Sequence, residues 1–396
     1  MLRVALSLVG NLCLFTRKTQ VNTAQAAIVL IAASLLLTAC SGAAKRPPPA
    51  ELGANTVLLG VRLAWTARVG EVPAGTVPAV VGNALVMAAK DGTVLSLDAR
   101  SGKDFWRSNA GAAVSTAVGF DGKTAAVVTR GNELVAFNAE DNGKELWRTR
   151  LGAQVYTTPL VAGGRVFVLA ADRSVSAFDG TSGRKLWTQT RTGDPLVLQQ
   201  AGSLQAVGDM LVVGLAGRLV GLSPNNGLPR WEAPIASPRG TNEIERLVDI
   251  VGRTSRVDNS ICARAFQAAV GCVDAARGTL VWSKPANAAE GIHGDDSLVV
   301  GAEADGKVIA WKRADGERVW VSERLQFRTL TAPLVLGRTV VVGDNSGNVH
   351  LLSREDGSPL NRMSTDTSGV VTAPVLAAGN LVVVTRSGNV YGFAPE

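Results

Sequence analysis

Two cysteines are the residues of this sequence whose side chains could react with each other. Cys262 and Cys272 lie ten residues apart, on the two strands of a predicted hairpin that is centred near Gln267. Residues that face each other across a hairpin come close enough for a disulfide, which forms in an oxidising compartment. We expect Cys262 and Cys272 to be bonded, and two buried free thiols are the alternative.

Catalytic and metal-binding motifs are scarce in this sequence. Its two histidines, His293 and His350, are far apart, and His350 lies in an alternating segment that is typical of a strand. The sequence contains no Cys/His cluster with metal-ligand spacing, no G-x-S-x-G and no phosphate-binding loop. We therefore interpret His350 as structural and expect no metal, no cofactor and no catalysed reaction.

The N-terminal residues form a targeting signal. Residues 26–39 are an apolar run of fourteen residues, which is shorter than the about twenty that a membrane-spanning helix needs. The run ends in Leu37-Thr38-Ala39-Cys40, which resembles a bacterial lipobox, where the chain is cleaved and the cysteine is lipidated. We predict a signal peptide at residues 1–39 and lipidation at Cys40. An ordinary secretory signal with an incidental cysteine is the alternative.

The residues after Cys40 predict where the chain is held. In bacterial lipoproteins an Asp directly after the cysteine retains the protein at the inner membrane, and here that residue is Ser41. We therefore expect a lipid-anchored protein of the outer membrane of a Gram-negative bacterium, facing the periplasm. Residues 40–60 are rich in Pro and Ala and predict a flexible or extended tether, followed by a single domain at residues 61–396.

The charge of the chain argues against a nucleic-acid partner. The formal net charge is +7, from 40 basic and 33 acidic residues. Residues 1–39 contain three basic and no acidic residues, so their removal leaves 37 basic residues and a net charge of +4. No cluster of five to eight Lys and Arg is present, and we expect no binding to nucleic acid.

A tryptophan recurs through the chain at nearly constant spacing. The intervals between successive members are 41, 41, 40, 44, 51 and 38 residues, and Asn361 falls 41 residues after the last of them. A turn rich in Asp and Gly precedes most of these positions, as in DARSGKDFW at 98–106. The recurring tryptophans are Trp65, Trp106, Trp147, Trp187, Trp231, Trp282 and Trp320.

The spacing predicts an all-β fold made of repeated four-stranded units. Eight alternating strands precede the turns, beginning at Gly92, Gly131, Arg173, Gly217, Ala268, Gly306, Gly347 and Gly388. A period of 40–45 residues with four strands per unit is typical of a β-propeller blade. Asp98 can accept hydrogen bonds from the turn, Gly102 can adopt a positive φ, and the tryptophan can fill the gap against the next blade.

The two ends of the chain predict how the ring closes. The sequence ends with the third strand of the last unit, and Trp65 belongs to an outer strand with no unit before it. We therefore expect the N-terminal strand to complete the last blade, giving an eight-bladed propeller of four-stranded antiparallel blades. Seven blades remain the alternative if the irregular unit at 231–282 is misinterpreted.

Two segments depart from the repeat and are the candidate binding residues. Residues 191–205 replace the usual entry to a blade and contain Leu196 and Leu198, which would face the same way in an extended chain. The interval 231–282 is about ten residues longer than the other units and contains the charged run 242–249. An inner strand and a solvated loop are the respective alternatives, but loops on a rigid scaffold often bind partners.

These features together resemble a known family. Repeats that end in D-x-x-x-G-x-x-x-W are those of the quinoprotein-like propellers, the PQQ repeats. The lipobox at Cys40, the phrase GTNEIERLVDI at 240–250 and the closing segments 331–352 and 372–393 resemble the BamB family, lipoproteins of the outer-membrane β-barrel assembly machine. The resemblance covers roughly residues 61–393.

The resemblance implies a scaffold that binds BamA through a periplasmic POTRA domain, and through it the other Bam lipoproteins. Unfolded outer-membrane proteins are further candidate partners. It implies contacts from Leu196 and Leu198, where Gln199 replaces a frequent arginine of the family. It also implies contacts from the charged segment, by Glu243, Glu245, Arg246 and Asp249. An arginine makes charge-assisted hydrogen bonds that Gln199 cannot make.

Two other functions are open. PQQ-dependent dehydrogenases share the repeat, but they resemble one another in having two adjacent cysteines, whereas Cys262 and Cys272 are ten residues apart. A periplasmic propeller that binds peptides or cell-wall material is the other alternative, and a propeller fold by itself does not distinguish between them.

Overall fold

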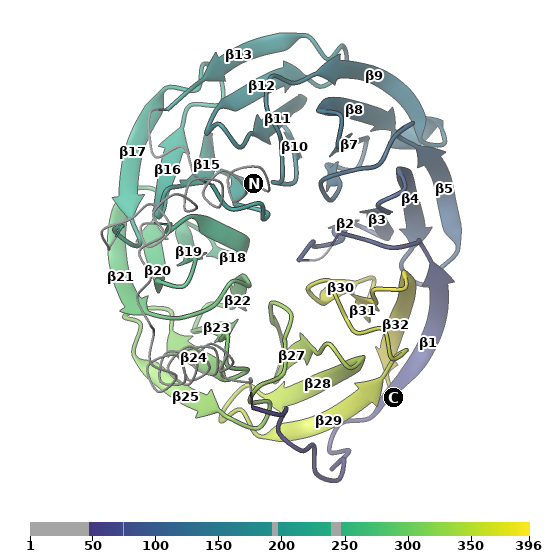
Figure 1. The fold of residues 1–396 in the computed structure, drawn as a ribbon, viewed down its shortest axis with the longest axis vertical. Coiled ribbons are helices and arrows are strands. Elements are labelled where there is room, and N and C mark those ends of the chain that lie inside the picture. The colour runs from purple at the N-terminus through teal and green to yellow at the C-terminus, as the bar shows by residue number, and fades with distance from the viewer. Residues whose placement is uncertain (1–46, 74, 192–196, 239–246) are drawn as a thin grey trace, which may run out of the picture. The chain divides into compact units, whose positions relative to one another are not determined.

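Eight four-stranded antiparallel sheets follow one another around a ring (Figure 1), so the predicted eight-bladed β-propeller is confirmed. The computed structural model describes residues 47–73, 75–191, 197–238 and 247–396, and residues 49–396 form one unit. Apart from strands, the described residues contain one short 3-10 helix, η1 (Ala139–Asp141). Among these residues we find no helix with the length and apolarity needed to cross a membrane.

Seven blades consist of four consecutive strands each, with the first strand nearest the centre of the ring and the fourth at its rim (Figure 1). The first to third blades are β2 (Ala79–Val81), β3 (Ala84–Ala88), β4 (Thr93–Asp98), β5 (Asp104–Asn109); β6 (Gly119–Phe120), β7 (Thr124–Val128), β8 (Glu133–Asn138), β9 (Lys144–Arg150); β10 (Leu160–Ala162), β11 (Arg165–Leu169), β12 (Val175–Asp179), β13 (Lys185–Gln189).

The next four blades repeat this order. The fourth and fifth are β14 (Leu204–Val207), β15 (Met210–Leu215), β16 (Arg218–Leu222), β17 (Pro229–Pro234); β18 (Ile250–Val257), β19 (Ser260–Ala265), β20 (Ala269–Asp274), β21 (Thr279–Pro285). The sixth and seventh are β22 (Ile292–Gly294), β23 (Leu298–Ala302), β24 (Val308–Lys312), β25 (Arg318–Ser322); β26 (Leu334–Leu336), β27 (Thr339–Gly343), β28 (Asn348–Ser353), β29 (Pro359–Ser364).

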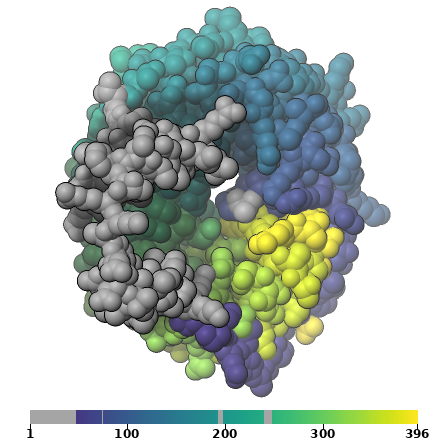
Figure 2. Space-filling view, viewed as in Figure 1, coloured from purple at the N-terminus to yellow at the C-terminus, as the bar shows by residue number. Residues whose placement is uncertain are grey.

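The eighth blade joins the two ends of the ring, as predicted. It consists of β30 (Val375–Ala377), β31 (Asn380–Val384), β32 (Asn389–Pro395) and, at the rim, β1 (Val61–Arg68). β1 and β32 pair from Val61 with Pro395 to Arg68 with Asn389. The first and last segments of the ring therefore lie side by side, purple against yellow in Figure 2. Their ladder of hydrogen bonds closes the ring without a covalent link.

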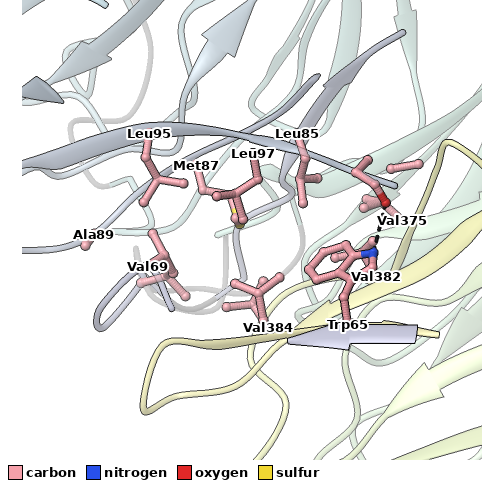
Figure 3. Close-up of a cluster of buried hydrophobic side chains, with 14 of the residues drawn as sticks. Trp65, Val69, Leu85, Met87, Ala89, Leu95, Leu97, Val375, Val382 and Val384 are labelled. Carbon is pink, nitrogen blue, oxygen red and sulfur yellow. Dashed lines mark hydrogen bonds between the residues drawn. The ribbon is translucent and has the colours of Figure 1, made fainter. Parts of the chain in front are cut away.

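A layer of apolar side chains joins the eighth blade to the first (Figure 3). Leu85 and Leu97 of the first blade face Val382 of the eighth, and all three are fully buried. Trp65 stands at the rim end of this layer. The inner strands carry apolar side chains on both faces here because each face of the sheet is covered by a neighbouring blade.

The recurring tryptophan packs on the turn of the next blade, as the sequence predicts. The Trp65 Nε1–H group donates to the Ala99 carbonyl oxygen at 3.0 Å. Gly102 in the same turn has a φ of +70°, and a Cβ there would lie 2.5 Å from the Trp65 ring. Any side chain at position 102 would clash with the Trp65 ring, so the turn needs glycine for space as well as for its positive φ. Trp147, Trp187, Trp282 and Trp320 donate in the same way to Gly180, Pro224, Arg313 and Arg354.

Asn361 takes the place of the eighth tryptophan. Its Nδ2 donates to the carbonyl oxygen of Leu59, two residues before β1, at 2.7 Å. The next blade has no turn at this place because its third and fourth strands come from opposite ends of the chain. A tryptophan here would have no turn glycine on which to pack, so an amide that binds the arriving N-terminal segment replaces it.

Cys262 and Cys272 lie directly opposite each other on β19 and β20, and a disulfide joins them. Both are fully buried. Gln267 lies in the turn of this hairpin with a φ of +47°, as the predicted centre near Gln267 requires.

Contacts with the ring begin before the predicted domain boundary. The Ala50 amide donates to the Gln326 carbonyl oxygen at 2.9 Å, and the Leu58 amide donates to Leu360 at 2.7 Å. Residues 50–59 therefore lie along the seventh blade. The division into a tether at 40–60 and a domain at 61–396 stays a prediction.

Candidate functional site

The described parts of the two irregular segments lie on one face of the ring. In each blade the fourth strand ends beside the hairpin between the second and third strands, as the pairing of Gln189 with Val175 shows in the third blade. The connections between blades and these hairpins therefore share a face, which we name the connection face. Residues 190–203 connect the third and fourth blades, and residues 235–249 connect the fourth and fifth.

Asp249 joins the two segments. The Leu198 backbone amide donates to Asp249 Oδ2 at 3.1 Å, and the Asp249 carbonyl oxygen accepts from the Phe266 amide at 2.9 Å. Arg173 Nη2, from the hairpin between β11 and β12, lies 3.7 Å from Asp249 Oδ1, and the two side chains are 11% and 18% exposed. One residue thus joins three parts of the ring: its carboxylate contacts the Leu198 amide and Arg173, and its backbone carbonyl oxygen binds the fifth blade at Phe266.

An open cavity adjoins this junction. It has a volume of about 810 Å³ and lies beside Leu198 and Gln199, with Val248, Phe266 and Leu280 among its lining residues. Leu198 is half-buried and Gln199 is exposed. The site therefore combines an open, mainly apolar hollow with polar groups at its edge, which suits the side chains of a partner protein better than a small polar substrate.

The structure places only some of the predicted site residues. It brings Leu198 and Asp249 into contact and leaves Gln199 at the surface. The other predicted residues lie outside the described residues, namely Cys40, Leu196, Glu243, Glu245 and Arg246.

Arg173 is a member of the junction that sequence reasoning missed. It has a φ of +63°, a left-handed conformation that costs a non-glycine residue about 1–2 kcal/mol. Other repeats have glycine here, for example Gly92, Gly306 and Gly347. An arginine at a glycine position of the repeat is the signal that could have identified it, because strain is retained where a side chain is needed.

The two histidines form hydrogen bonds within and between blades. His350 Nε2 donates to the buried carboxylate of Asp344 at 2.9 Å, which fits its predicted structural role. His293 Nδ1 accepts the Val335 amide at 3.0 Å and so links the sixth and seventh blades. Within the part of the chain that the structure describes, no three His, Cys, Asp or Glu residues are grouped to hold a metal.

His293 should make the ring less stable in acid. Burial, and then the cations of Arg253 and Arg313, lower the pKa of His293 from 6.5 to about 3. Below pH 6.5 the imidazole of His293 is therefore protonated in the unfolded chain but stays neutral in the folded chain. As the pH is lowered from 6.5 to 3, the free energy of unfolding falls by about 1.4 kcal/mol per pH unit. Denaturant titrations at pH 7 and 5 should differ by about 2 kcal/mol from this residue alone.

The variant His293→Gln tests this pH dependence, because its amide oxygen can still accept the Val335 amide but does not titrate. Its unfolding free energy should depend less steeply on pH than that of the unaltered protein by about 2 kcal/mol over the same interval. Equal slopes for the two proteins would contradict the assignment.

Comparison with known proteins identifies the family. A family model described as outer membrane protein assembly factor BamB matches residues 90–322. The protein of that name from Burkholderia pseudomallei is 37% identical over 376 residues, which cover 94% of this chain and 98% of that protein. This chain belongs to the BamB family.

Solved structures agree on the fold. The crystal structure of BamB from Moraxella catarrhalis superposes with a TM-score of 0.77 at 23% identity, covering 84% of this chain and 99% of that chain. A quinohemoprotein alcohol dehydrogenase from Pseudomonas putida HK5 superposes with a TM-score of 0.66 at 14% identity, covering 89% and 78%. At such identities these likenesses show the propeller alone, and the BamB assignment depends on the sequence match.

Proposed function

We propose that this protein is a non-catalytic scaffold lipoprotein of the outer-membrane β-barrel assembly machine. It is anchored at Cys40 in the outer membrane and faces the periplasm. Its ring binds the periplasmic POTRA region of BamA, and so the other Bam lipoproteins, and assists the folding and insertion of β-barrel proteins. The names of its relatives, outer membrane protein assembly factors, support this function.

The junction at Asp249 is the observation that carries the proposal. Two segments that the family resemblance marks as partner contacts are about fifty residues apart in sequence, yet the Leu198 amide binds the Asp249 carboxylate directly. The contact prearranges both segments before a partner arrives, which lowers the entropy cost of binding. A half-buried leucine beside charged groups is the usual composition of a modest protein interface.

Arg173 supplies a guanidinium near the position of Gln199, where the family often has an arginine, but it does not replace that arginine fully. Its guanidinium lies at the junction, but it is 11% exposed and faces Asp249. We infer that Arg173 positions the Asp249 carboxylate, while the exposed Gln199 amide forms neutral hydrogen bonds with the partner. Neutral hydrogen bonds are weaker than the charge-assisted bonds of an arginine.

Affinity purification from native outer membranes tests the function. The tagged protein should recover BamA and the other Bam lipoproteins, identified by mass spectrometry. Recovery of peptidoglycan fragments or periplasmic peptides without BamA would favour the cell-wall alternative. Dye-linked alcohol oxidation after addition of the quinone and calcium would favour the dehydrogenase, and either result would overturn the scaffold.

Replacement of the proposed lipidation site gives a separate prediction. Cys40→Ala should leave the protein without lipid and move it from the outer-membrane fraction to the periplasmic fraction, because a lipidated cysteine is the proposed anchor. Mass spectrometry of the mature N-terminus and cell fractionation measure both effects. If Cys40→Ala still carries lipid, the signal was misinterpreted.

A further inference from the structure

Residues 50–58 lie along the outer edge of the seventh blade, outside β29 (Figure 1). The Leu58 amide donates to Leu360 at 2.7 Å, and Asn55 Nδ2 donates to the Asn361 side chain and to the Arg362 carbonyl oxygen, both at 2.9 Å. We name residues 50–58 the strap. It covers backbone groups that the last strand of a blade otherwise presents to solvent.

Two arginines of the ring clamp the strap. Arg362 donates through Nη1 to the Leu52 carbonyl oxygen at 3.3 Å and through Nη2 to Gly53 at 3.2 Å. Arg328 donates through Nη2 to the Ala50 carbonyl oxygen at 2.9 Å, while its Nη1 is 3.1 Å from Asp344 Oδ2. The planar guanidinium group holds two acceptors in a fixed geometry, so each clamp fixes the direction of the strap.

The strap leaves the ring on the connection face. At its N-terminal end Ala50 binds Gln326 and Arg328, which lie in the connection between β25 and β26. Asp344, the other partner of Arg328, lies in the hairpin between β27 and β28. Both segments belong to the connection face, the face that carries the junction of Leu198 and Asp249.

We propose that the strap orients the anchored ring so that the connection face is turned toward the outer membrane. The proposal rests on lipidation of Cys40, which is part of the proposed function. Ala50 lies only ten positions after Cys40, and an extended chain of that length spans at most about 36 Å.

The opposite orientation is disfavoured by the length of the tether. A strand of five residues adds about 17 Å between the two faces, so a tether that had to pass around the rim would use much of its reach. Without the strap, the free chain from Cys40 would extend to residue 60, reach about twice as far, and allow either face to approach the membrane.

Fluorescence measurements on the lipidated full-length protein test this orientation. The protein is reconstituted, without BamA, in phosphatidylethanolamine–phosphatidylglycerol vesicles that carry an acceptor dye on the lipid headgroup. A donor dye is placed by Ser346→Cys on the connection face or by Glu355→Cys on the opposite face. Both residues are exposed and belong to the seventh blade, so the pair compares the two faces of one blade.

We expect about twofold more energy transfer from the dye at Ser346→Cys, because the faces are separated by the length of a strand. Adding Asn55→Ala, Arg328→Ala and Arg362→Ala together should release the strap and remove the difference between the two dyes. The melting temperature of that variant controls for unfolding of the ring.

Equal transfer from the two dyes, or more from Glu355→Cys, would overturn the orientation. A difference that persists after release of the strap would show that the strap does not cause it. If the protein does not float with the vesicles, the anchor at Cys40 fails and the orientation fails with it. Loss of BamA capture in the purification experiment leaves this measurement unaffected, so the two proposals fail separately.

Discussion

Trp65→Ala should lower the free energy of unfolding by about 3–5 kcal/mol, the usual loss when a large aromatic side chain is removed from a core. Trp65 is 7% exposed, its Nε1 binds the Ala99 carbonyl oxygen, and its ring covers Gly102. It also lies on β1, the strand that completes the eighth blade. The loss should appear as a lower midpoint in guanidinium unfolding.

Trp231→Ala is the matched control for this prediction. Trp231 also covers a turn glycine, Gly278, but it is half-buried, and its Nε1 meets Met210 Sδ at 3.3 Å instead of a carbonyl oxygen of the next blade. Its removal forfeits less buried area and a weaker hydrogen bond, so we expect a loss smaller by about 1–2 kcal/mol. Equal losses in the two variants would contradict the assignment of the difference to buried area and to the hydrogen bond with Ala99.

Most of the fold could be predicted because each blade repeats the same arrangement of strands, turn and packing against its neighbour. The intervals between tryptophans reveal the period, and the orphan strand around Trp65 reveals how the ring closes. Local chemistry was equally readable: Asp98 Oδ1 accepts the Arg100 amide at 3.1 Å within the predicted turn. A feature that every blade needs recurs in the sequence at a constant interval, and this repetition makes it recognisable.

Features that occur once were harder to predict. The Pro- and Ala-rich composition of residues 40–60 predicts a free tether, but composition does not reveal that Arg362 binds the carbonyl oxygens of Leu52 and Gly53, more than 300 residues away. Sequence likewise marks Leu198 and Asp249 as unusual, but not that a backbone amide of one binds the side chain of the other. Such contacts depend on how successive blades are stacked around the ring.

Asp249→Ala should weaken the capture of BamA by about tenfold, or about 1.4 kcal/mol. Removal of the carboxylate takes away the acceptor of the Leu198 amide and an anion that lies 3.7 Å from the Arg173 guanidinium. Both segments of the proposed interface then lose their shared attachment, and the cost of ordering them moves to the binding step. Titration of the purified ring with the POTRA region of BamA measures the dissociation constant.

Asp249→Asn should bind BamA with an affinity between those of the unaltered protein and Asp249→Ala. Its amide oxygen can still accept the Leu198 amide, although the charge facing Arg173 is lost. Asp209→Ala is the matched control: it also removes an acid from an arginine, Arg230 at 2.7 Å, but in the turn between β14 and β15, on the opposite face of the fourth blade. This control should bind BamA normally. Unchanged affinity in Asp249→Ala, or an equal loss in Asp209→Ala, would show that the junction does not organise the interface.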